Sequence, residues 1–487
     1  MNTNGVSLSS TDVLAESSLF QASPDQTEAA LLAREREVCS WGDTVHYAAS
    51  PKLFTRCQGS FLYDSQDRPY LDLQMWHSSV NLGYAYPPII EAVKRQLDVL
   101  PQVASQYLHR EKIELAGRIV DETQKRFGVK GRVHFNVGGA QAIEDALKLV
   151  RKVTGRARML AFEGGYHGRT LGASAISSSY RYREPFGEFG DRAEFLPYPH
   201  CVRCPFGEPR DRQHCCMQGV EQVARKFDHE YTGWWNPKTG HAEFGALFLE
   251  PVQGTGGGYV IPPAEYFPRL AEICRSHGIL IVDDEVKVGF YRTGTLWAIE
   301  HFNVVPDIIV FGKSLTNGLN PLSGIWAREG LINPERFEPG TTHSTFASNP
   351  LGTAAGLEVM KVFAEGDYAR TVREKGAYFL GLLRRLQARH PAIAHVDGIG
   401  LALRLELCRR DGTTPNRALA HRIMEQGLEG RLRIHGRPGG IVLDVGGYDK
   451  HVIAIAPSLH ITTEEMDVAY ELLDALFTAC THEGPGA

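Results

Sequence analysis

The sequence predicts an α/β protein whose main sheet is mostly parallel and covered by helices. Two observations support this prediction. Between residues 101 and 364, short apolar or β-branched runs alternate with amphipathic helical stretches, and this alternation is typical of βαβ units. From about residue 365 onward, a long helical stretch is followed by further strands at residues 401–407 and 451–459, which indicates a second, smaller domain.

The individual elements follow from the apolar runs. The runs RVHFNV, RMLAF, FGALFLE, GILIVDD and DIIVFG are the expected strands of the main sheet, at residues 132–137, 158–162, 244–250, 278–284 and 307–312. Helices are expected between them, for example over residues 140–153 and over residues 263–278, where Gly278 is the expected C-cap.

The domain boundaries follow from the same patterns. Residues 1–35 show no clear periodicity and are interpreted as an N-terminal arm. Residues 101–364 form the predicted large domain. Residues 36–100 contain a hairpin candidate at residues 59–73, and we expect them to join residues 365–487 in a small α+β domain built from both chain ends.

The composition is that of a globular protein that acts on small molecules. Of the 487 residues, 43% are hydrophobic and 22% are charged, and the formal net charge is −5. This balance gives no electrostatic reason to expect nucleic acid or an anionic membrane as a partner. The N-terminus lacks a basic region followed by an apolar run, and no apolar stretch approaches the ~20 residues of a membrane span, so a cytoplasmic protein is predicted.

Ligands of an open α/β sheet gather at the carboxyl ends of its strands, so the residues after each apolar run are candidates for the functional site. The first run is followed by Gly138 and Gly139 at the start of a helix, where backbone N–H groups and the helix dipole can hold a phosphate. A tight turn without a ligand is the alternative. The second run leads to Tyr166 and His167 on a glycine-rich loop, which presents either an aromatic face for stacking a planar ring or a packed surface turn.

A carboxylate and a lysine end the last two runs. Asp283 and Glu285 alternate with Asp284 along the chain, so Asp284 points to the opposite face of the strand. A carboxylate at the end of a buried strand is costly unless a cation or hydrogen-bond donors lie against it. Lys313 ends a buried run among glycines, where desolvation would lower the pKa of its amine and make the amine nucleophilic toward a carbonyl. The alternative is an ion pair with Asp284 or a neighbouring acid.

Together, a phosphate cradle, an aromatic side chain, a carboxylate and a lysine on one edge meet the requirements for binding pyridoxal 5'-phosphate. The segments that carry them are FNVGGAQAIEDALKLVR, FEGGYHGRTLGA, LEPVQGTGG, LIVDDEVKVGFYRTG, FGKSLTNGLNPLSG and HSTFASNPLGTAAGLEVM. In their residues, spacing and order, these segments resemble the class III pyridoxal-phosphate aminotransferases, relatives of ornithine and γ-aminobutyrate aminotransferases, over roughly residues 40–475. The resemblance implies fold type I, with a seven-stranded type of sheet in the large domain.

The resemblance also implies roles for individual residues. It makes Lys313 the Schiff-base lysine and proton shuttle, and Asp284 the partner of the pyridine nitrogen. The remaining cofactor-binding residues supply backbone donors, contacts to the ring and contacts to its polar groups: Gly139, Ala140, Tyr166, His167, Glu250, Val286 and Lys287. Thr345 would reach the phosphate from the other subunit, which implies a homodimer with both sites at its interface, or a tetramer built from such dimers.

Four positions depart from the family pattern. Gly138 stands where the family usually has a serine, and Trp76 replaces an early glycine. Lys287 replaces the usual glutamine near the phenolic oxygen of the cofactor, a substitution similar to that of relatives that racemise or epimerise amino acids. Ala454 stands where relatives carry the arginine that grips the substrate carboxylate, so an atypical substrate is expected. The candidates to replace that arginine are Arg181, Arg183, Arg433 and Arg437.

A cluster of cysteines lies between the second and third apolar runs. Cys201 and Cys204 have the Cys-x-x-Cys spacing of zinc or iron–sulfur ligands, and Cys215 and Cys216 follow them, with His200 and His214 nearby. Two adjacent cysteines do not easily bind one ion, and a surface loop can carry cysteines without a metal. No metal site is therefore assigned, and the nine cysteines do not predict a disulfide scaffold.

The leading functional prediction is a pyridoxal-phosphate-dependent transferase that moves an amino group from an amino acid or another amine to a 2-oxo acid. The alternatives keep the cofactor and change the outcome: a racemase or epimerase, or an elimination, replacement or carbon–carbon bond-forming enzyme of specialised metabolism. Lys287 favours racemisation or epimerisation, whereas Ala454 favours a specialised substrate. A non-enzymatic protein of this fold would not need both Lys313 and Asp284 at adjoining strand ends.

Overall fold

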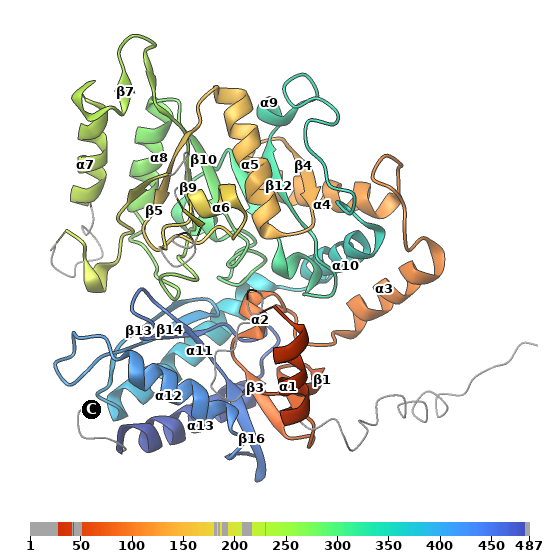
Figure 1. Ribbon diagram of the computed structural model, residues 1–487, viewed down its shortest axis with the longest axis vertical. Helices are drawn as coiled ribbons and strands as arrows, with labels where there is room; N and C mark the ends of the chain where they lie inside the picture. The colour runs from red at the N-terminus through yellow and green to blue at the C-terminus, as the bar shows by residue number, and fades with distance from the viewer. Residues whose placement is uncertain are drawn as a thin grey trace, which may run out of the picture.

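The computed structural model describes residues 28–40, 42, 51–179, 183, 186–187, 193–206, 217–228 and 230–482. Figure 1 shows a larger part built around one sheet and a smaller part in which the orange-red N-terminal and blue C-terminal segments lie together. Among the described residues, no helix is both long enough and apolar enough to cross a membrane.

The larger part is organised by a seven-stranded sheet in the order β4-β12-β11-β10-β9-β5-β6. β12 runs antiparallel to β11 and β4, and the other neighbouring pairs are parallel. The strands are β4 (Gly131–Asn136), β5 (Arg158–Phe162), β6 (Glu194–Leu196), β9 (Phe244–Leu249), β10 (Leu280–Asp284), β11 (Ile308–Phe311) and β12 (Ser323–Arg328). The prediction of a mostly parallel sheet is confirmed, and all five predicted apolar runs are strands of it.

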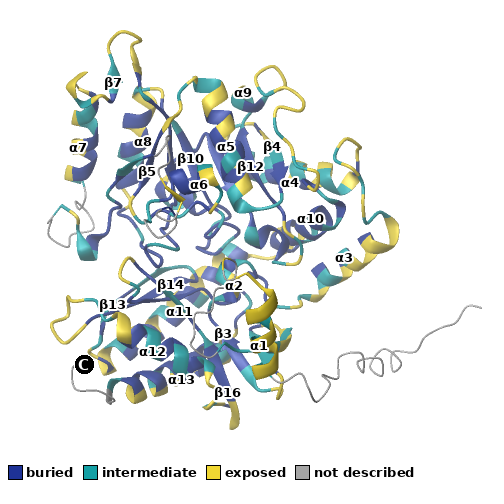
Figure 2. Ribbon diagram, viewed as in Figure 1, coloured by how far each residue is buried: buried dark blue, intermediate teal, exposed yellow. Residues whose placement is uncertain are grey.

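The central strands β9, β10, β11 and β12 are buried almost throughout, and since successive side chains point to opposite sides, both of their faces are covered. Ile308 and Val310 of β11 join one apolar cluster, and Ile309 and Phe311 join the other. The first cluster lies under α5 (Gly139–Thr154), α6 (Leu171–Ala175) and α9 (Glu329–Ile332). The second lies under α4 (Arg110–Phe127), α7 (Met217–Phe227), α8 (Tyr266–Ser276) and α10 (Pro350–Glu365). Figure 2 shows these strands in the dark blue of buried residues.

The smaller part contains two sheets. A five-stranded sheet has the order β1-β2-β3-β16-β15, and a four-stranded sheet has the order β13-β14-β18-β17. The strands are β1 (Phe54–Gln58), β2 (Phe61–Asp64), β3 (Pro69–Asp72), β13 (Ile393–Ile399), β14 (Ala402–Leu407), β15 (Leu432–Ile434), β16 (Arg437–Val442), β17 (Asp444–Gly446) and β18 (Val452–Ile455). Its helices are α1 (Glu28–Val38), α2 (Met75–Ser78), α11 (Tyr368–Arg389), α12 (Arg417–Leu428) and α13 (Thr463–His482).

The two ends of the chain meet in the five-stranded sheet, where β3 runs parallel to β16 and Tyr70 is in register with Gly440. The hairpin candidate at residues 59–73 forms β2 and β3, which pair antiparallel. α3 (Pro87–Val99) also lies before residue 100, but it packs against α10 of the larger part (Figure 1).

Short elements complete the chain. β7 (Trp235–Asn236) and β8 (His241–Ala242) form a two-stranded ribbon. Single 3-10 turns occur at η4 (Cys201–Arg203), η5 (Glu230–Thr232), η6 (Ala298–Phe302) and η7 (Lys313–Thr316). η7 begins two residues after β11 ends, so it lies at the carboxyl end of that strand, where a ligand of such a sheet is expected.

Candidate active site

A cavity of about 480 Å³ lies at the carboxyl ends of β10 and β11, where α2 of the smaller part also reaches it. Its lining residues are His77, Gly139, Ala140, Tyr166, His167, Gly168, Arg169, Glu250, Thr255, Asp284, Val286, Lys287 and Lys313. All the sequence-predicted site residues except Thr345 are in this set. Thr345 is exposed and is not among the described residues that line the cavity.

Lys313 is the first residue of η7 and follows the buried strand β11. Its backbone has φ of 43°, in the left-handed region that residues with side chains rarely adopt, and such strain is concentrated at functional sites. Burial, together with the nearby charge of Lys287, lowers the pKa of Lys313 from 10.5 to about 8. A sizeable fraction of this amine is therefore unprotonated near neutral pH and can act as a nucleophile or base.

Asp284 ends β10 and is bound to His167, not to Lys313. His167 Nδ1 lies 2.7 Å from Asp284 Oδ2, and the backbone N–H of Val286 donates to Asp284 Oδ1 at 3.1 Å. Burial alone would lower the pKa of His167, but the hydrogen bond and charge of Asp284 outweigh burial and raise it. His167 is therefore a hydrogen-bonding partner of the buried carboxylate at the end of the strand, and the alternative of an ion pair between Lys313 and Asp284 is not seen among the described residues.

The N-terminus of α5 opens into the cavity. Gly138 precedes the helix in an extended conformation, and no side chain caps the first turn, so the backbone N–H groups at Gly139 and Ala140 face the cavity without a side-chain acceptor. A side chain at Gly139 would place its Cβ 3.2 Å from a methyl group of Val286, and one at Gly168 would collide with Ala140. The bare backbone at a 16-residue helix N-terminus suits a phosphate group.

Tyr166, Val286 and Glu250 are among the side chains that line the cavity. Glu250 is buried, and its two carboxylate oxygens accept hydrogen bonds of 3.0 Å from the backbone N–H groups of Tyr166 and Gly254. Burial, the largest cause, raises the pKa of Glu250. Glu250 thus fixes the loop that carries Tyr166, a contact that the sequence did not indicate.

Lys287 and His77 form the wall of the cavity that faces the smaller part. Lys287 Nζ lies 3.6 Å from Asp444 Oδ2 on β17, and His77 Nδ1 lies 3.5 Å from the same oxygen. Burial would lower the pKa of Lys287, but Tyr259, Asp444 and other acidic groups outweigh it and raise the pKa, so Lys287 is a cation. His77 and Asp444 are site residues that sequence reasoning missed.

His77 is presented by an unusual backbone. Met75, Trp76, His77 and Ser78 all have positive φ, between 46° and 64°, although none of them is glycine. Each such residue costs roughly 1–2 kcal/mol, so the turn persists only because the surroundings hold it. The carboxylate of Asp72 accepts hydrogen bonds from the backbone N–H groups of Gln74 and Met75, and the hydroxyl of Ser78 bonds that of Tyr259 at 2.8 Å. No glycine marks this turn in the sequence, and only Asp72, which caps it, indicates its presence.

The described candidates for a substrate-binding arginine do not line the cavity. Ala454 is buried in an apolar cluster with Val252 and Tyr259. Arg433 and Arg437 lie on the β15–β16 hairpin, where Arg433 donates to the carbonyl of Gly436. Arg183 donates to the carbonyl of Ser178, and Arg181 lies outside the described residues. None of the described candidates is among the cavity-lining residues.

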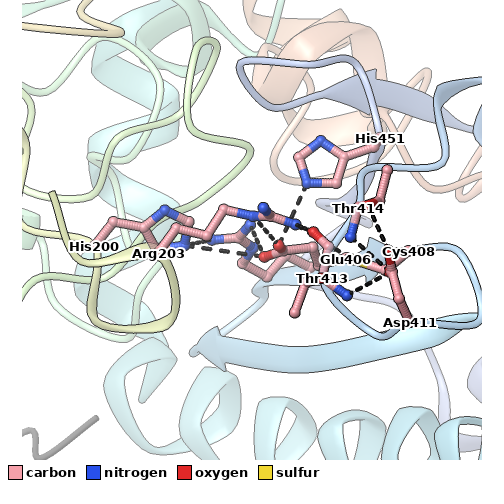
Figure 3. A network of polar contacts seen from close by, with 9 residues as sticks. His200, Arg203, Glu406, Cys408, Asp411, Thr413, Thr414 and His451 are labelled. Carbon is pink, nitrogen blue, oxygen red and sulfur yellow. Dashed lines mark hydrogen bonds and ion pairs between the residues drawn. The ribbon is translucent and has the colours of Figure 1, made fainter. Parts of the chain in front are cut away.

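A buried charge network surrounds Glu406 in the four-stranded sheet (Figure 3). Glu406 on β14 accepts from Arg203 of η4, pairs with Arg404 at 3.0 Å and lies 3.3 Å from His451 Nε2. Arg404 also lies 3.2 Å from the ring nitrogen of His200. Because Arg203 and His200 belong to the larger part, this network joins the two parts of the chain.

The cysteine cluster is only partly described. Cys201 lies in η4 and is buried, and Cys204 follows η4 and is partly buried. His214, Cys215 and Cys216 lie outside the described residues. In the part of the chain that the structure describes, no group of three His, Cys, Asp or Glu side chains is arranged to hold a metal ion.

The lysine, the carboxylate and the open helix N-terminus suit pyridoxal 5'-phosphate, and the chain belongs to the family described as Aminotransferase class-III, which matches residues 44–477. The protein is therefore a pyridoxal-phosphate-dependent enzyme with the fold of that family. It is 30% identical to a leucine/methionine racemase of Thermococcus litoralis, over 87% of this chain and 90% of the relative. It is also 30% identical to an acetylornithine aminotransferase of Caldanaerobacter subterraneus, over 88% of this chain and 95% of the relative.

Solved structures show the same likeness. An amine transaminase from an uncultivated Pseudomonas species, in its PLP-bound form, matches with a TM-score of 0.80 and 27% identity, over 91% of this chain and 99% of that chain. The predicted family, fold and cofactor are confirmed.

Proposed function

We propose that the protein is an aminotransferase that moves the amino group of an amino acid or another amine to a 2-oxo acid. The observation that carries the proposal is the pairing, in one cavity, of a lysine whose pKa is lowered to about 8 with a carboxylate at the end of the adjacent strand. Pyridoxal phosphate, when bound, supplies an aldehyde that takes up the amino group and a ring that withdraws electrons from the substrate α-carbon.

The residues of the chain then have separate tasks. Lys313 Nζ would hold the cofactor through its aldehyde carbon and, once freed by the substrate amine, would take the proton from the substrate α-carbon and deliver it to that cofactor carbon. Asp284, oriented by His167, would accept a hydrogen bond from the pyridine N–H group. The backbone N–H groups at Gly139 and Ala140 would hold the phosphate, and Tyr166 and Val286 would contact the ring.

We further propose that the enzyme works as a homodimer. α3 and the loop after it expose several large apolar side chains, as the yellow stretch of α3 in Figure 2 illustrates: Leu97, Val99, Tyr107 and Leu108. An exposed apolar surface of this kind is typical of an interface. Thr345, which does not reach the cavity of its own chain, would bind the phosphate held by the partner subunit.

The proposal is tested with one amino donor at a time and no acceptor. An aminotransferase converts a stoichiometric amount of donor to its oxo acid and leaves the amino form of the cofactor, which absorbance and mass spectrometry of the released cofactor detect. Lys313→Ala is expected to abolish trapping of the cofactor on the protein by borohydride. Persistence of trapping at another lysine would contradict the assignment of Lys313.

Racemisation or epimerisation is the second candidate. The observation that favours it is Lys287 at the cavity wall, together with the similarity to a leucine/methionine racemase. A racemase incorporates deuterium from D₂O at the α-carbon and inverts the amino acid, while the amino group and the aldehyde form of the cofactor are retained. Chiral chromatography of the recovered amino acid separates the two candidates.

A further inference from the structure

The proposed transamination does not use the ion pair between Lys287 and Asp444. The side chain of Lys287 is 8% exposed and that of Asp444 is 17% exposed. Lys287 follows β10 of the larger part, whereas Asp444 begins β17 of the smaller part. The pair therefore joins the two parts at the wall of the cavity that contains Lys313.

The strand register places Asp444 beside Ala454, the position at which relatives are expected to carry an arginine. β18 lies between β14 and β17, and Ala454 is in register with Arg404 on one side and with Asp444 on the other. Residues in register have their side chains on the same face of the sheet. The carboxylate of Asp444 therefore stands next to the uncharged Ala454, and the cation that meets it comes from the larger part.

Lys287 is held in a fixed position and remains charged. Its methylene groups pass over Gly254, where an added Cβ would lie 2.5 Å from Lys287 Cδ. Its ammonium group lies 4.8 Å from the centre of the Tyr259 ring. At 3.6 Å the contact to Asp444 is an ion pair longer than a hydrogen bond, so the N–H groups of Lys287 can turn toward an anion in the cavity.

The other buried and rim cations are less suitable for such an anion. Arg404, in register with Ala454, is buried and engaged by Glu406, and it does not line the cavity among the described residues. Arg169 does line the cavity, but its neighbour Gly168 packs against Ala140 at the N-terminus of α5, which is the phosphate end. Lys287 lies instead with His77 at the wall that faces the smaller part, where both meet Asp444.

We propose that Lys287 binds the carboxylate of the substrate and that Asp444 and His77 position its ammonium group. The inference rests on the proposed function, because it requires an amino-acid or 2-oxo-acid substrate in this cavity. Lys287 and Lys313 line the same cavity. We assign to Lys287 the carboxylate next to the reacting carbon, so the substrates are α-amino acids and 2-oxo acids.

The test measures binding without turnover. Propanoate and 4-methylpentanoate carry no amino or oxo group, and their amides are neutral counterparts of the same shape. Their binding to the cofactor-loaded enzyme is measured by calorimetry for the wild type, for Lys287→Met and for the matched control Arg169→Met. Cofactor content and circular dichroism confirm that each variant is folded and loaded.

Lys287→Met is expected to weaken carboxylate binding at least tenfold, which corresponds to about 1.4 kcal/mol, and to leave amide binding unchanged. Arg169→Met is expected to change carboxylate binding by less than about threefold. A smaller loss in Lys287→Met, or no carboxylate binding to the wild type, overturns the inference. If Lys287→Met does not fold, Asp444→Asn replaces it: weaker carboxylate binding supports the inference, and unchanged binding overturns it.

The failure of this inference and the failure of the proposed function can be told apart. Failure of every amino donor in the half-reaction refutes transamination, even if Lys287 binds carboxylates. Unchanged carboxylate binding in Lys287→Met, together with a working half-reaction, refutes only the role of Lys287.

Discussion

Replacing Glu406 with Gln tests the buried charge network of Figure 3. Glu406 is 1% exposed and faces Arg404, which is 2% exposed, so neither group has water as an alternative partner. Removing the negative charge leaves the Arg404 guanidinium buried without its anion, and His451 and Arg203 lose the same partner. Breaking a buried pair in this way costs about 3–5 kcal/mol, so Glu406→Gln is expected to lower the free energy of unfolding by that amount.

The assay is urea unfolding followed by both circular dichroism and tryptophan fluorescence, at fixed protein and cofactor concentrations. Glu329→Gln is the matched control, because its ion pair with Arg132 is exposed, at 45% and 50%, and contributes at most about 1 kcal/mol. Equal effects of the two substitutions would refute the reasoning, since they would show that burial adds nothing to the Glu406 network.

The pH dependence gives a second check on Glu406. Burial alone would raise the pKa of Glu406, but His451, Arg404 and Arg203 outweigh it and hold the pKa well below the ordinary value. A carboxyl group whose pKa is lower in the folded state stabilises the fold above its unfolded pKa of about 4.3 and loses that contribution as the pH falls. The advantage of the wild type over Glu406→Gln is therefore expected to shrink below about pH 4.

Three further predictions follow from the site and its support. The rate at which cofactor-free protein takes up pyridoxal phosphate is expected to rise through about pH 8, the pKa of Lys313, and Lys287→Met should move that midpoint upward by removing a like charge. Asp283 and Glu285 are a buried acid pair, and burial raises the pKa of Glu285 to about 8. Because these folded pKa values lie above the unfolded ones, stability should fall as the pH rises toward 8, and Asp283→Asn should reduce that fall, as measured by urea midpoints across this range. Gly256→Ala would place a Cβ 1.9 Å from the carbonyl oxygen of Gly164, so loss of cofactor retention or of soluble protein is expected, whereas Gly381→Ala, with no atom within 4 Å, should be neutral or stabilising by up to about 1 kcal/mol.

The large sheet could be predicted because its strands are buried on both faces. Such strands appear in the sequence as continuous apolar runs, and the carboxyl end of each run identified a residue that lines the cavity. β6 and β12 were missed, since β6 has three residues and β12 begins with Ser323 and Gly324, which do not extend an apolar run.

The partners of the site residues could not be predicted in the same way. His167 and Asp284 are 117 residues apart, and their contact depends on the order of strands in the folded sheet. Asp444 begins a three-residue strand with no apolar pattern, so nothing in its local sequence indicates that it meets Lys287. The left-handed turn at Met75–Ser78 is fixed by Asp72 and Tyr259 and not by the preferences of its own residues.

The parallel pairing of β3 with β16 sets the time at which the catalytic cavity can be completed in the cell. Roughly 370 residues of chain separate Tyr70 from Gly440, so β3 leaves the ribosome long before its neighbour exists. At about 5–20 residues per second, translation of the intervening chain takes roughly 20–70 seconds. During that interval the segment that carries His77 has an unpaired strand edge, and such an edge is prone to aggregation until β16 has been made.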